Sequence, residues 1–358
     1  MKRVLVANIF GIGDVLFTTP LLASLKKEVE GVSIDYICNA RTKAVLESNP
    51  DVDSIFVYEK DDLADLWQRS KKSFFSALSG LFGGIRGSRY DAVFDFTLSR
   101  KFGLAFALAG IPKRIGLDYK NRGVFLTHKR KLEGFEGKHV VEYYLDLLDE
   151  AGVRPAVRET QIVLDESSQN WAEEYLRNRG INKDRVVAVI PGGGASWGPD
   201  ASRKRWRPDG FARVADALTE RSVQVMVLGD GAEEDLCCEV RDNMAKKPAL
   251  VENGLALKEY IALLSMCGLV VCNDGGPLHI AVALGARTVS VFGPVDEKVY
   301  GPYPPNDRNR VVSGDEEDCR PCYSRFRLPE CDRDIRCLSG ISPGVVIENC
   351  LELLEKDA

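Results

Sequence analysis

The sequence has no long apolar run. No stretch of its 358 residues approaches the roughly 18 consecutive apolar residues of a membrane-spanning helix. The opening run MKRVLVANIFGIGDVLFTTP is interrupted by Asn8, Gly11, Gly13 and Asp14, unlike the apolar centre of a signal peptide. These absences predict a cytoplasmic protein, in which the ten cysteines are expected as thiols or metal ligands rather than as a disulfide framework.

The complete glycine fingerprints of common nucleotide-binding enzymes are also missing. The turn NIFGIGD at residues 8–14 contains GxG without the third glycine of a dinucleotide site, and the P-loop pattern GxxxxGK[ST] occurs nowhere. This weakens an NAD-binding or nucleotide-hydrolysing interpretation. Asp14, in the same turn, fits either a helix cap or a general base at the mouth of a cleft.

Charge is distributed unevenly along the chain. The net charge is −5, but residues 69–131 contain 14 basic and three acidic side chains, a local charge of +11. Such a segment can concentrate an anionic ligand or contact an anionic membrane surface. Within it, KKSFFSALSGLFGGI at residues 71–85 fits an interfacial helix, or equally the buried side of an ordinary helix with a solvated basic edge.

Strand-like runs alternate with helical patterns along the whole chain, which predicts parallel sheets covered by helices. Because single cores rarely grow beyond roughly 250 to 300 residues, we expect two successive α/β units, with the boundary between Gly152 and Arg185. The predicted strands are Val4–Ile9, Ser33–Ile37, Ser54–Val57, Asp91–Phe96, Val186–Ile190, Val223–Leu228, Ala249–Val251, Leu269–Cys272 and Thr288–Phe292. The predicted helices include 15–30, 42–48, 63–82 and 167–179.

Open α/β sheets bind ligands at the carboxyl ends of their strands. The most informative segment there is NDGGPLHIAVALGARTVSVFGP at residues 273–294, a glycine-rich turn between a buried strand and a short apolar helix. Gly275 and Gly276 let the backbone approach a ligand, and the helix N-terminus favours phosphate. Asp274 adds an acceptor and His279 a switchable donor. The alternative is an ordinary strand-to-helix turn with a satisfied histidine.

Two further segments fall at strand ends. The loop IPGGGASWGPDASRKRWRPDGF begins with glycines at 192–194 and carries Lys204, a combination suited to a diphosphate, or otherwise a solvated basic loop. In LGDGAEED, Glu233 lies early in a helix, where it either accepts ribose hydroxyls or compensates the helix dipole.

Four cysteines are clustered late in the chain with the spacing C-x2-C-x8-C-x5-C. Such a cluster can form a tetrahedral zinc site, although this spacing is irregular for a zinc ribbon. Free thiols or a disulfide pair are the alternatives. The candidate ligands are Cys319, Cys322, Cys331 and Cys337.

Taken together, these segments resemble glycosyltransferase family 9, the ADP-heptose:lipopolysaccharide heptosyltransferases. The resemblance covers nearly the whole chain and rests on GIGDVLFTTPLLASLK, PGGGA followed by KRWRPDGFARVADAL, the LGDGAEE turn and NDGGPLHIAVALGARTVSVFGP. It implies the GT-B fold, two Rossmann-like domains facing across a cleft. The implied domains are an acceptor domain at 1–165, a nucleotide-sugar domain at 166–342 and a C-terminal helix at 343–358 that crosses back to the first domain.

The resemblance also implies inverting, metal-independent transfer of heptose from ADP-heptose to an anionic glycolipid acceptor, with no cofactor required. Asp14 matches the base, Lys204 the lysine at the donor phosphates, and Glu233 the acid at the ribose. The remaining implied donor-binding residues are Gly193, Gly194, Asp274 at the sugar, and Gly275, Gly276 and His279 at the diphosphate. The implied acceptor- or membrane-facing residues are Lys71, Lys72 and Arg86.

Two departures from the family pattern concern the sugar. Gly275 stands where many members carry threonine, and Arg207 is inserted between Trp206 and Pro208. The alternatives are therefore transfer of another sugar from another nucleotide, or a non-catalytic nucleotide-sugar or glycan-binding module. The implied location is the cytoplasm, including the cytoplasmic face of the inner membrane, and no nucleic-acid partner is expected.

Overall fold

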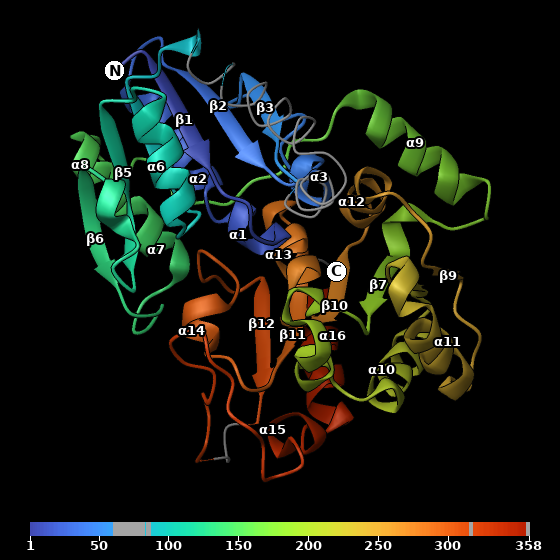
Figure 1. Ribbon diagram of the computed structural model, residues 1–358. Coiled ribbons are helices and arrows are strands. Elements are labelled where there is room, and N and C mark those ends of the chain that lie inside the picture. Colours follow the sequence, from blue (N-terminus) through green and yellow to red (C-terminus); the bar gives the residue numbers. More distant parts are fainter. Residues whose placement is uncertain (60–82, 84–86, 315–317, 356–358) are drawn as a thin grey trace, which may run out of the picture. The chain divides into compact units, whose positions relative to one another are not determined.

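The chain folds into two compact units in the computed structural model. One unit is built from Met1–Phe135 and Val140–Thr160, and the other from Glu136–His139 and Gln161–Ala358. Each unit contains a six-stranded sheet in which every strand pair is parallel (Figure 1). The two sheets confirm the predicted α/β fold class. The structure describes residues 1–59, 83, 87–314 and 318–355.

The sheet of the first unit has the strand order β3-β2-β1-β4-β5-β6. Its central strands carry β-branched and aromatic side chains that are buried on both faces, as expected of parallel strands. On one face Leu5 and Val93 pack against Phe102 and Phe106 of helix α6. The strands are β1 (Arg3–Ala7), β2 (Ser33–Cys38), β3 (Ser54–Val57), β4 (Ala92–Asp95), β5 (Lys113–Tyr119) and β6 (His128–Leu132). The helices are α1 (Ile12–Leu16), α2 (Thr19–Glu28), α3 (Ala40–Lys43), α6 (Arg100–Leu108), η1 (Gly123–Phe125), α7 (Val140–Leu145) and α8 (Leu147–Ala151).

The sheet of the second unit has the strand order β12-β11-β10-β7-β8-β9. Its strands are β7 (Val186–Ile190), β8 (Gln224–Leu228), β9 (Leu250–Glu252), β10 (Leu269–Asn273), β11 (Arg287–Phe292) and β12 (Asn309–Ser313). The longer helices are α9 (Glu166–Arg177), α10 (Pro208–Glu220), α11 (Glu234–Asn243), α12 (Leu257–Ser265), α13 (Gly276–Ala283) and α16 (Pro343–Glu355). The shorter ones are η2 (Lys183–Arg185), η3 (Ala195–Lys204), η4 (Gly231–Glu233), α14 (Glu297–Tyr300) and α15 (Arg336–Ser339).

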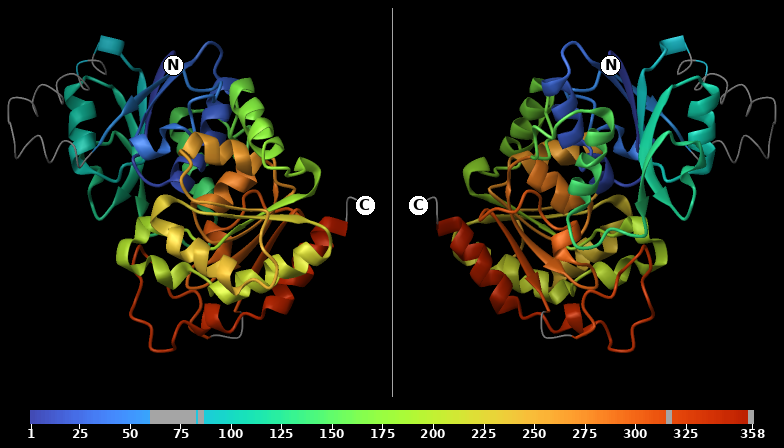
Figure 2. Two further views of the ribbon diagram at one scale, coloured as in Figure 1. Left: turned by 90° about the vertical axis from the view of Figure 1, so that its right-hand side faces the viewer. Right: turned by 90° about the vertical axis from the view of Figure 1, so that its left-hand side faces the viewer.

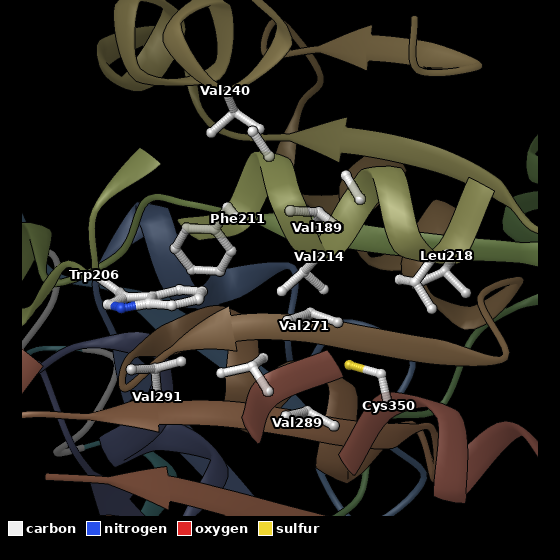
Figure 3. Packing of buried hydrophobic residues seen from close by; sticks show 14 of the residues in the cluster. Val189, Trp206, Phe211, Val214, Leu218, Val240, Val271, Val289, Val291 and Cys350 are labelled. Atoms are coloured by element: carbon white, nitrogen blue, oxygen red, sulfur yellow. The ribbon is translucent and has the colours of Figure 1, made fainter. Parts of the chain in front are cut away.

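One apolar cluster joins the second sheet to helices α10, α11 and α16 (Figure 3). Phe211 and Val214 of α10 lie over Val189 and Val271 of the sheet, and Cys350 of α16 packs in the same layer. The interface is tight where α10 begins, because a Cβ at Gly210 would lie 2.6 Å from the Trp206 ring. This layer fixes the carboxyl ends of β7, β8 and β10 relative to one another.

Most strands were predictable, and the three that the sequence did not predict have exposed or charged faces. Strand β6, HKRKL, alternates half-buried and exposed residues until the buried Leu132, and β12, NRVVS, is half-buried along most of its length. Both form edges of their sheets, and edge strands commonly carry charges that prevent pairing with other chains. The missing apolar signal therefore follows from their edge positions, while β5 begins with the basic pair Lys113 and Arg114.

Part of the basic charge in residues 69–131 is paired with acidic neighbours in the described chain. Lys129 Nζ lies 2.8 Å from Asp118 Oδ2, and Lys131 Nζ lies 2.8 Å from Glu133 Oε1. Arg130 contacts three carboxylates at 3.1 to 3.4 Å, those of Asp146, Asp149 and Glu150. The local charge of +11 therefore overstates the positive surface that this segment offers to a ligand.

The C-terminal helix α16 packs along the sheet of the second unit, as both views in Figure 2 show. It contributes Val346, Cys350 and Leu353 to the apolar cluster. Its predicted return to the first domain stays a prediction. Within the described residues, no helix combines the length and apolar character needed to cross a bilayer.

Replacing Phe211 by alanine should destabilise the second unit. Phe211 is fully buried beside Trp206, with ring centroids 5.1 Å apart, so the truncation leaves a cavity in the main apolar cluster. We expect Phe211→Ala to lower the free energy of unfolding by about 3 to 5 kcal/mol, measured by urea denaturation. The control is Val345→Ala on α16, whose side chain is 46% exposed and should change stability little. Equal small effects of both variants would contradict this packing.

Candidate functional site

The predicted donor residues meet at one point of the second sheet. Strand order reverses direction between β7 and β10, which makes this pair the topological switch point of the sheet. Ligands of open α/β sheets bind outside the carboxyl ends of the strands at such a point. The loop that follows β7 and the turn that follows β10 both begin there, at Pro191 and Asp274. The fold thus brings together two segments that begin about eighty residues apart in the sequence, at Pro191 and Asp274.

The glycine loop after β7 has a backbone that other residues would not readily adopt. Gly193 has φ +104° and Gly194 has φ +77°, in the left-handed region that favours glycine. At Gly192 a Cβ would overlap with the carboxylate of Glu233. The three glycines therefore let the chain turn tightly against Glu233.

The Glu233 carboxylate holds the glycine loop through hydrogen bonds. Its Oε1 accepts a hydrogen bond from Gly193 N–H at 2.6 Å, and its Oε2 accepts one from Asp230 N–H at 3.2 Å. Arg205 completes the arrangement, because its Nη2 donates to Glu233 Oε1 at 3.1 Å and its Nε donates to the Gly193 carbonyl at 2.9 Å. The ion pair of Glu233 and Arg205 thus binds both the N–H and the carbonyl of Gly193. Sequence reasoning assigned Glu233 to this site but gave Arg205 no role.

Asn273, the last residue of β10, connects three segments of the site. Its side chain is buried, and its Nδ2 donates to the carbonyls of Pro191 at 2.8 Å and Gly192 at 3.1 Å. Its Oδ1 accepts a hydrogen bond from Trp206 N–H at 2.8 Å. Asn273 therefore orients the glycine loop and the start of α10 together. The feature of the sequence that could have indicated this role is a polar residue directly after an apolar strand.

Lys204 and Asp274 form a buried ion pair. Lys204 Nζ lies 2.5 Å from Asp274 Oδ2, and both side chains are less than a tenth exposed. Within the described residues, Asp274 Oδ2 has no hydrogen bond besides this ion pair. On its other side the Lys204 ammonium lies 4.5 Å from the centroid of the Trp197 ring. A cation and an acceptor are thus held side by side at the switch point.

The turn after β10 supplies a helix N-terminus to the same place. Gly275 precedes α13, Pro277 occupies the first turn, and the apolar residues Leu278 and Ile280 anchor the helix. An ideal Cβ at Gly275 would lie 3.3 Å from Gly194 N, so the turn and the glycine loop approach each other closely. Pro277 has no N–H and the His279 N–H bonds to the Gly275 carbonyl, so the first-turn donors of α13 are the N–H groups of Gly276 and Leu278, which together with the helix dipole favour an anion here.

His279 lies in α13, one turn after Gly275, and is buried. Burial, followed by the charges of His139 and Lys204, lowers the pKa of the His279 imidazole to about 3. His279 is therefore neutral at neutral pH. His139 stacks on Tyr303 with ring centroids 4.6 Å apart, and its Nε2 donates to the Gly301 carbonyl at 3.1 Å. Sequence reasoning gave His139 no role in this environment.

In the first unit, Asp14 lies at the carboxyl end of β1. Its Oδ2 accepts a hydrogen bond from Gly11 N–H at 3.2 Å, which caps α1, and the side chain remains half-buried. Strand order reverses between β1 and β4, so the end of β4 belongs to the same switch point. There Asp95 is buried and accepts hydrogen bonds from Thr97 N–H at 2.9 Å and Thr97 Oγ1 at 2.6 Å. Burial raises the pKa of Asp95 to about 6.

The proposed zinc site at the four cysteines finds no support. The described residues, which include all four, contain no group of three or more His, Cys, Asp or Glu side chains able to hold a metal ion. Cys337 is buried against the apolar cluster, whereas Cys331 is exposed, so the thiols lie in different environments. Burial, followed by the nearby Cys322 thiol, raises the pKa of Cys337 to about 11.

The predicted acceptor-facing residues Lys71, Lys72 and Arg86 lie outside the described residues. The structure therefore does not test their assignment. Their assignment stays a prediction.

Comparison with known proteins identifies one family. A model described as glycosyltransferase family 9 (heptosyltransferase) matches residues 80–330. The lipopolysaccharide heptosyltransferase 3 of Escherichia coli K12 is 26% identical over 356 residues, covering 97% of this chain and 96% of that protein.

Two solved structures share the fold over essentially the whole chain. The glycosyl transferase family 9 protein of Veillonella parvula has a TM-score of 0.82 at 22% identity, covering 99% of this chain and 98% of its own. The E. coli ADP-heptose lps heptosyltransferase II has a TM-score of 0.76 at 21% identity, with both chains covered completely. The likeness agrees with the GT-B fold predicted from the sequence.

The buried His279 should make stability depend on pH. Its pKa is about 3 in the folded chain and has the ordinary value of 6.5 when unfolded, so between these values only the unfolded chain binds the proton. Stability is therefore lost as the pH falls through this range. We expect the thermal midpoint to drop less in His279→Asn than in wild type between about pH 7 and about pH 5.

The control for this measurement is His128→Asn, on the edge strand β6 of the other unit, which should respond to pH as wild type does. A pH response in His279→Asn identical to that of wild type would show that His279 is not the buried neutral group.

Proposed function

The chain belongs to glycosyltransferase family 9, the heptosyltransferases, and we propose that it catalyses inverting transfer of heptose from ADP-heptose to a hydroxyl of an anionic lipopolysaccharide inner-core acceptor. The observation that carries the proposal is the buried Lys204–Asp274 pair between the glycine loop and the N-terminus of α13. A nucleotide-sugar needs these three elements together: backbone N–H groups for the diphosphate, a cation for the leaving phosphate, and an acceptor for a sugar hydroxyl.

In the donor half, the diphosphate binds beside Lys204, where the first turn of α13 meets the glycine loop at Gly193 and Gly194. Lys204 neutralises the charge that develops on the departing ADP, so the transfer requires no metal ion. Asp274 accepts a hydrogen bond from a sugar hydroxyl through its carboxylate, which is held beside the Lys204 ammonium. Glu233 contacts the ribose, since it lies at the end of β8, the neighbour of β7.

In the acceptor half, Asp14 acts as the general base. It accepts the proton of the acceptor hydroxyl while that oxygen bonds to the anomeric carbon and the bond from this carbon to the phosphate oxygen breaks. ADP leaves with the electron pair, and one displacement inverts the configuration. The half-buried carboxylate of Asp14 suits this role, because the hydrogen bond from Gly11 N–H fixes its position at the start of α1.

The anionic acceptor is assigned to the basic segment at residues 69–131, and Lys71, Lys72 and Arg86 are proposed to contact it. Lys129, Arg130 and Lys131 are already paired with carboxylates, which leaves the earlier basic residues as the stronger candidates. An acceptor anchored in a membrane places the enzyme at the cytoplasmic face of the inner membrane, as a peripheral protein.

Asp14→Asn should separate chemistry from donor binding. Asparagine can still accept the hydrogen bond from Gly11 N–H, but it cannot take up the proton. We therefore expect turnover to fall by about 10²-fold or more while calorimetric ADP affinity stays unchanged. The matched control is Asp91→Asn just before β4, at the amino ends of the strands, where Asp91 accepts hydrogen bonds from Lys2 and Arg3 N–H. Near-normal turnover of Asp14→Asn would exclude the role of general base.

The nucleotide can be identified without any acceptor. Calorimetry with ADP, UDP and GDP should show the tightest binding for ADP. Tighter binding of UDP or GDP would contradict ADP-heptose as the donor but not the assignment to the family. It would favour transfer of another sugar from another nucleotide, the alternative suggested by Gly275. Failure of all three to bind would favour a module without transferase activity.

A further inference from the structure

The cysteine-bearing loop, residues 318–335, is attached to the carboxyl end of β11. Arg320 Nε donates to the Gly293 carbonyl at 2.6 Å, and the N–H groups of Cys322 and Tyr323 donate to the Pro294 carbonyl at 3.1 and 3.0 Å. These bonds place the loop at the carboxyl end of the strand next to β10. The loop is therefore held at the edge of the sheet that carries the donor residues.

Tyr323 connects this loop to Lys204 through aromatic contacts. Its ring lies 4.7 Å from the Trp197 ring at an interplanar angle of 32°, and Tyr300 of α14 packs against it edge-on at 5.9 Å. Trp197 in turn lies 4.5 Å from the Lys204 ammonium. A continuous row of contacts thus runs from α14 through the loop to the Lys204–Asp274 pair.

A second contact fixes the loop to the same segment. Arg203, the neighbour of Lys204, donates from Nη2 to the Pro329 carbonyl at 2.6 Å. The segment from Trp197 to Lys204 is irregular, with a kink at Gly198, so its own backbone gives it little rigidity. The loop therefore supplies support that η3 lacks.

The strand order indicates which part of the donor this support concerns. Glu233, assigned to the ribose, follows β8 on one side of the switch point, whereas Tyr300 and the cysteine-bearing loop follow β11 on the other side. Lys204 and Asp274 lie between them, at β7 and β10. A donor that binds with its ribose at Glu233 and extends along the carboxyl ends of the strands therefore places its phosphates and sugar near Trp197 and Tyr323.

We propose that Tyr323 is a positioning residue for transfer: it holds Trp197 against Lys204, so that the cysteine-bearing loop orients the lysine at the phosphate and sugar end of the donor. This inference rests on the proposed function. It also gives the loop a role that needs no metal at its cysteines, because the aromatic ring and the backbone bonds to Gly293 and Pro294 make the connection.

Tyr323→Ala should lower kcat/KM for the donor by about 3- to 10-fold, the effect of losing one aromatic pair. Tyr323→Phe should stay near wild type, since it keeps the ring, and KM for the acceptor should not change in either variant. The matched control is Trp171→Ala on α9, which removes an aromatic pair of similar geometry, at 4.9 Å and 33° to Tyr175.

A readout without turnover separates this inference from the proposed function. Trp197 fluorescence, identified by its loss in Trp197→Phe, should change when ADP binds the wild type and Tyr323→Phe, and change less in Tyr323→Ala. If the wild type binds ADP and Tyr323→Ala matches it in fluorescence and kcat/KM, the inference is overturned while the proposed function stands. If the wild type neither binds ADP nor transfers sugar, the proposed function fails, and the inference fails with it.

Discussion

The buried pair of Lys204 and Asp274 is the interaction on which the site of the second unit depends. Removing one partner of a buried ion pair leaves an uncompensated charge, which is strongly destabilising, so both side chains must be held in place. Lys204 ends η3 in the loop after β7, Asp274 follows β10, and Asn273 ties this loop to β10 through the Pro191 and Gly192 carbonyls. The glycine backbone at Gly193 and Gly194 then lets the chain pass close enough for the contact. Packing, hydrogen bonding and backbone geometry thus converge on one ion pair.

An anionic donor changes the balance within this pair. In the proposed complex the diphosphate brings negative charge to Lys204, which then no longer depends on Asp274 alone. The Asp274 carboxylate can then accept a hydrogen bond from a sugar hydroxyl. Lys204 thus contacts the diphosphate and Asp274 contacts the sugar. Preorganised charges of this kind need little rearrangement during reaction. Neutral His279 suits the same environment, because a second cation beside Lys204 would be repelled before the donor arrives.

The fold was largely predictable because parallel strands are buried on both faces and read as apolar runs. Strand β7, VVAVI, has the predicted bounds, and β10 differs from its prediction by one residue. Edge strand β6 was not predicted because its exposed face carries charge instead of an apolar pattern, and edge strand β12 was not predicted because only Val311 and Val312 in it are apolar. The position of Asp274 directly after β10 could be anticipated for the same reason, whereas Lys204 lies at the end of η3, fourteen residues beyond β7. Arg205 and Asn273 could not be, because their roles depend on partners remote in the sequence.

Glu233 shows how far a sequence motif can describe a side chain's chemistry. As an acid early in a helix it suggested either a ribose contact or dipole compensation, yet most of its capacity is used within the protein. A carboxylate offers about four lone-pair sites, and Gly193 N–H, Asp230 N–H and Arg205 occupy three. A ribose that engages Glu233 with two hydroxyls must therefore displace one partner. Arg205 is the one partner of these three that donates from a side chain, 25% exposed, so it can move without a change in the backbone, and its departure also releases the Gly193 carbonyl. Ribose recognition and the shape of the diphosphate loop are thereby coupled through a single carboxylate.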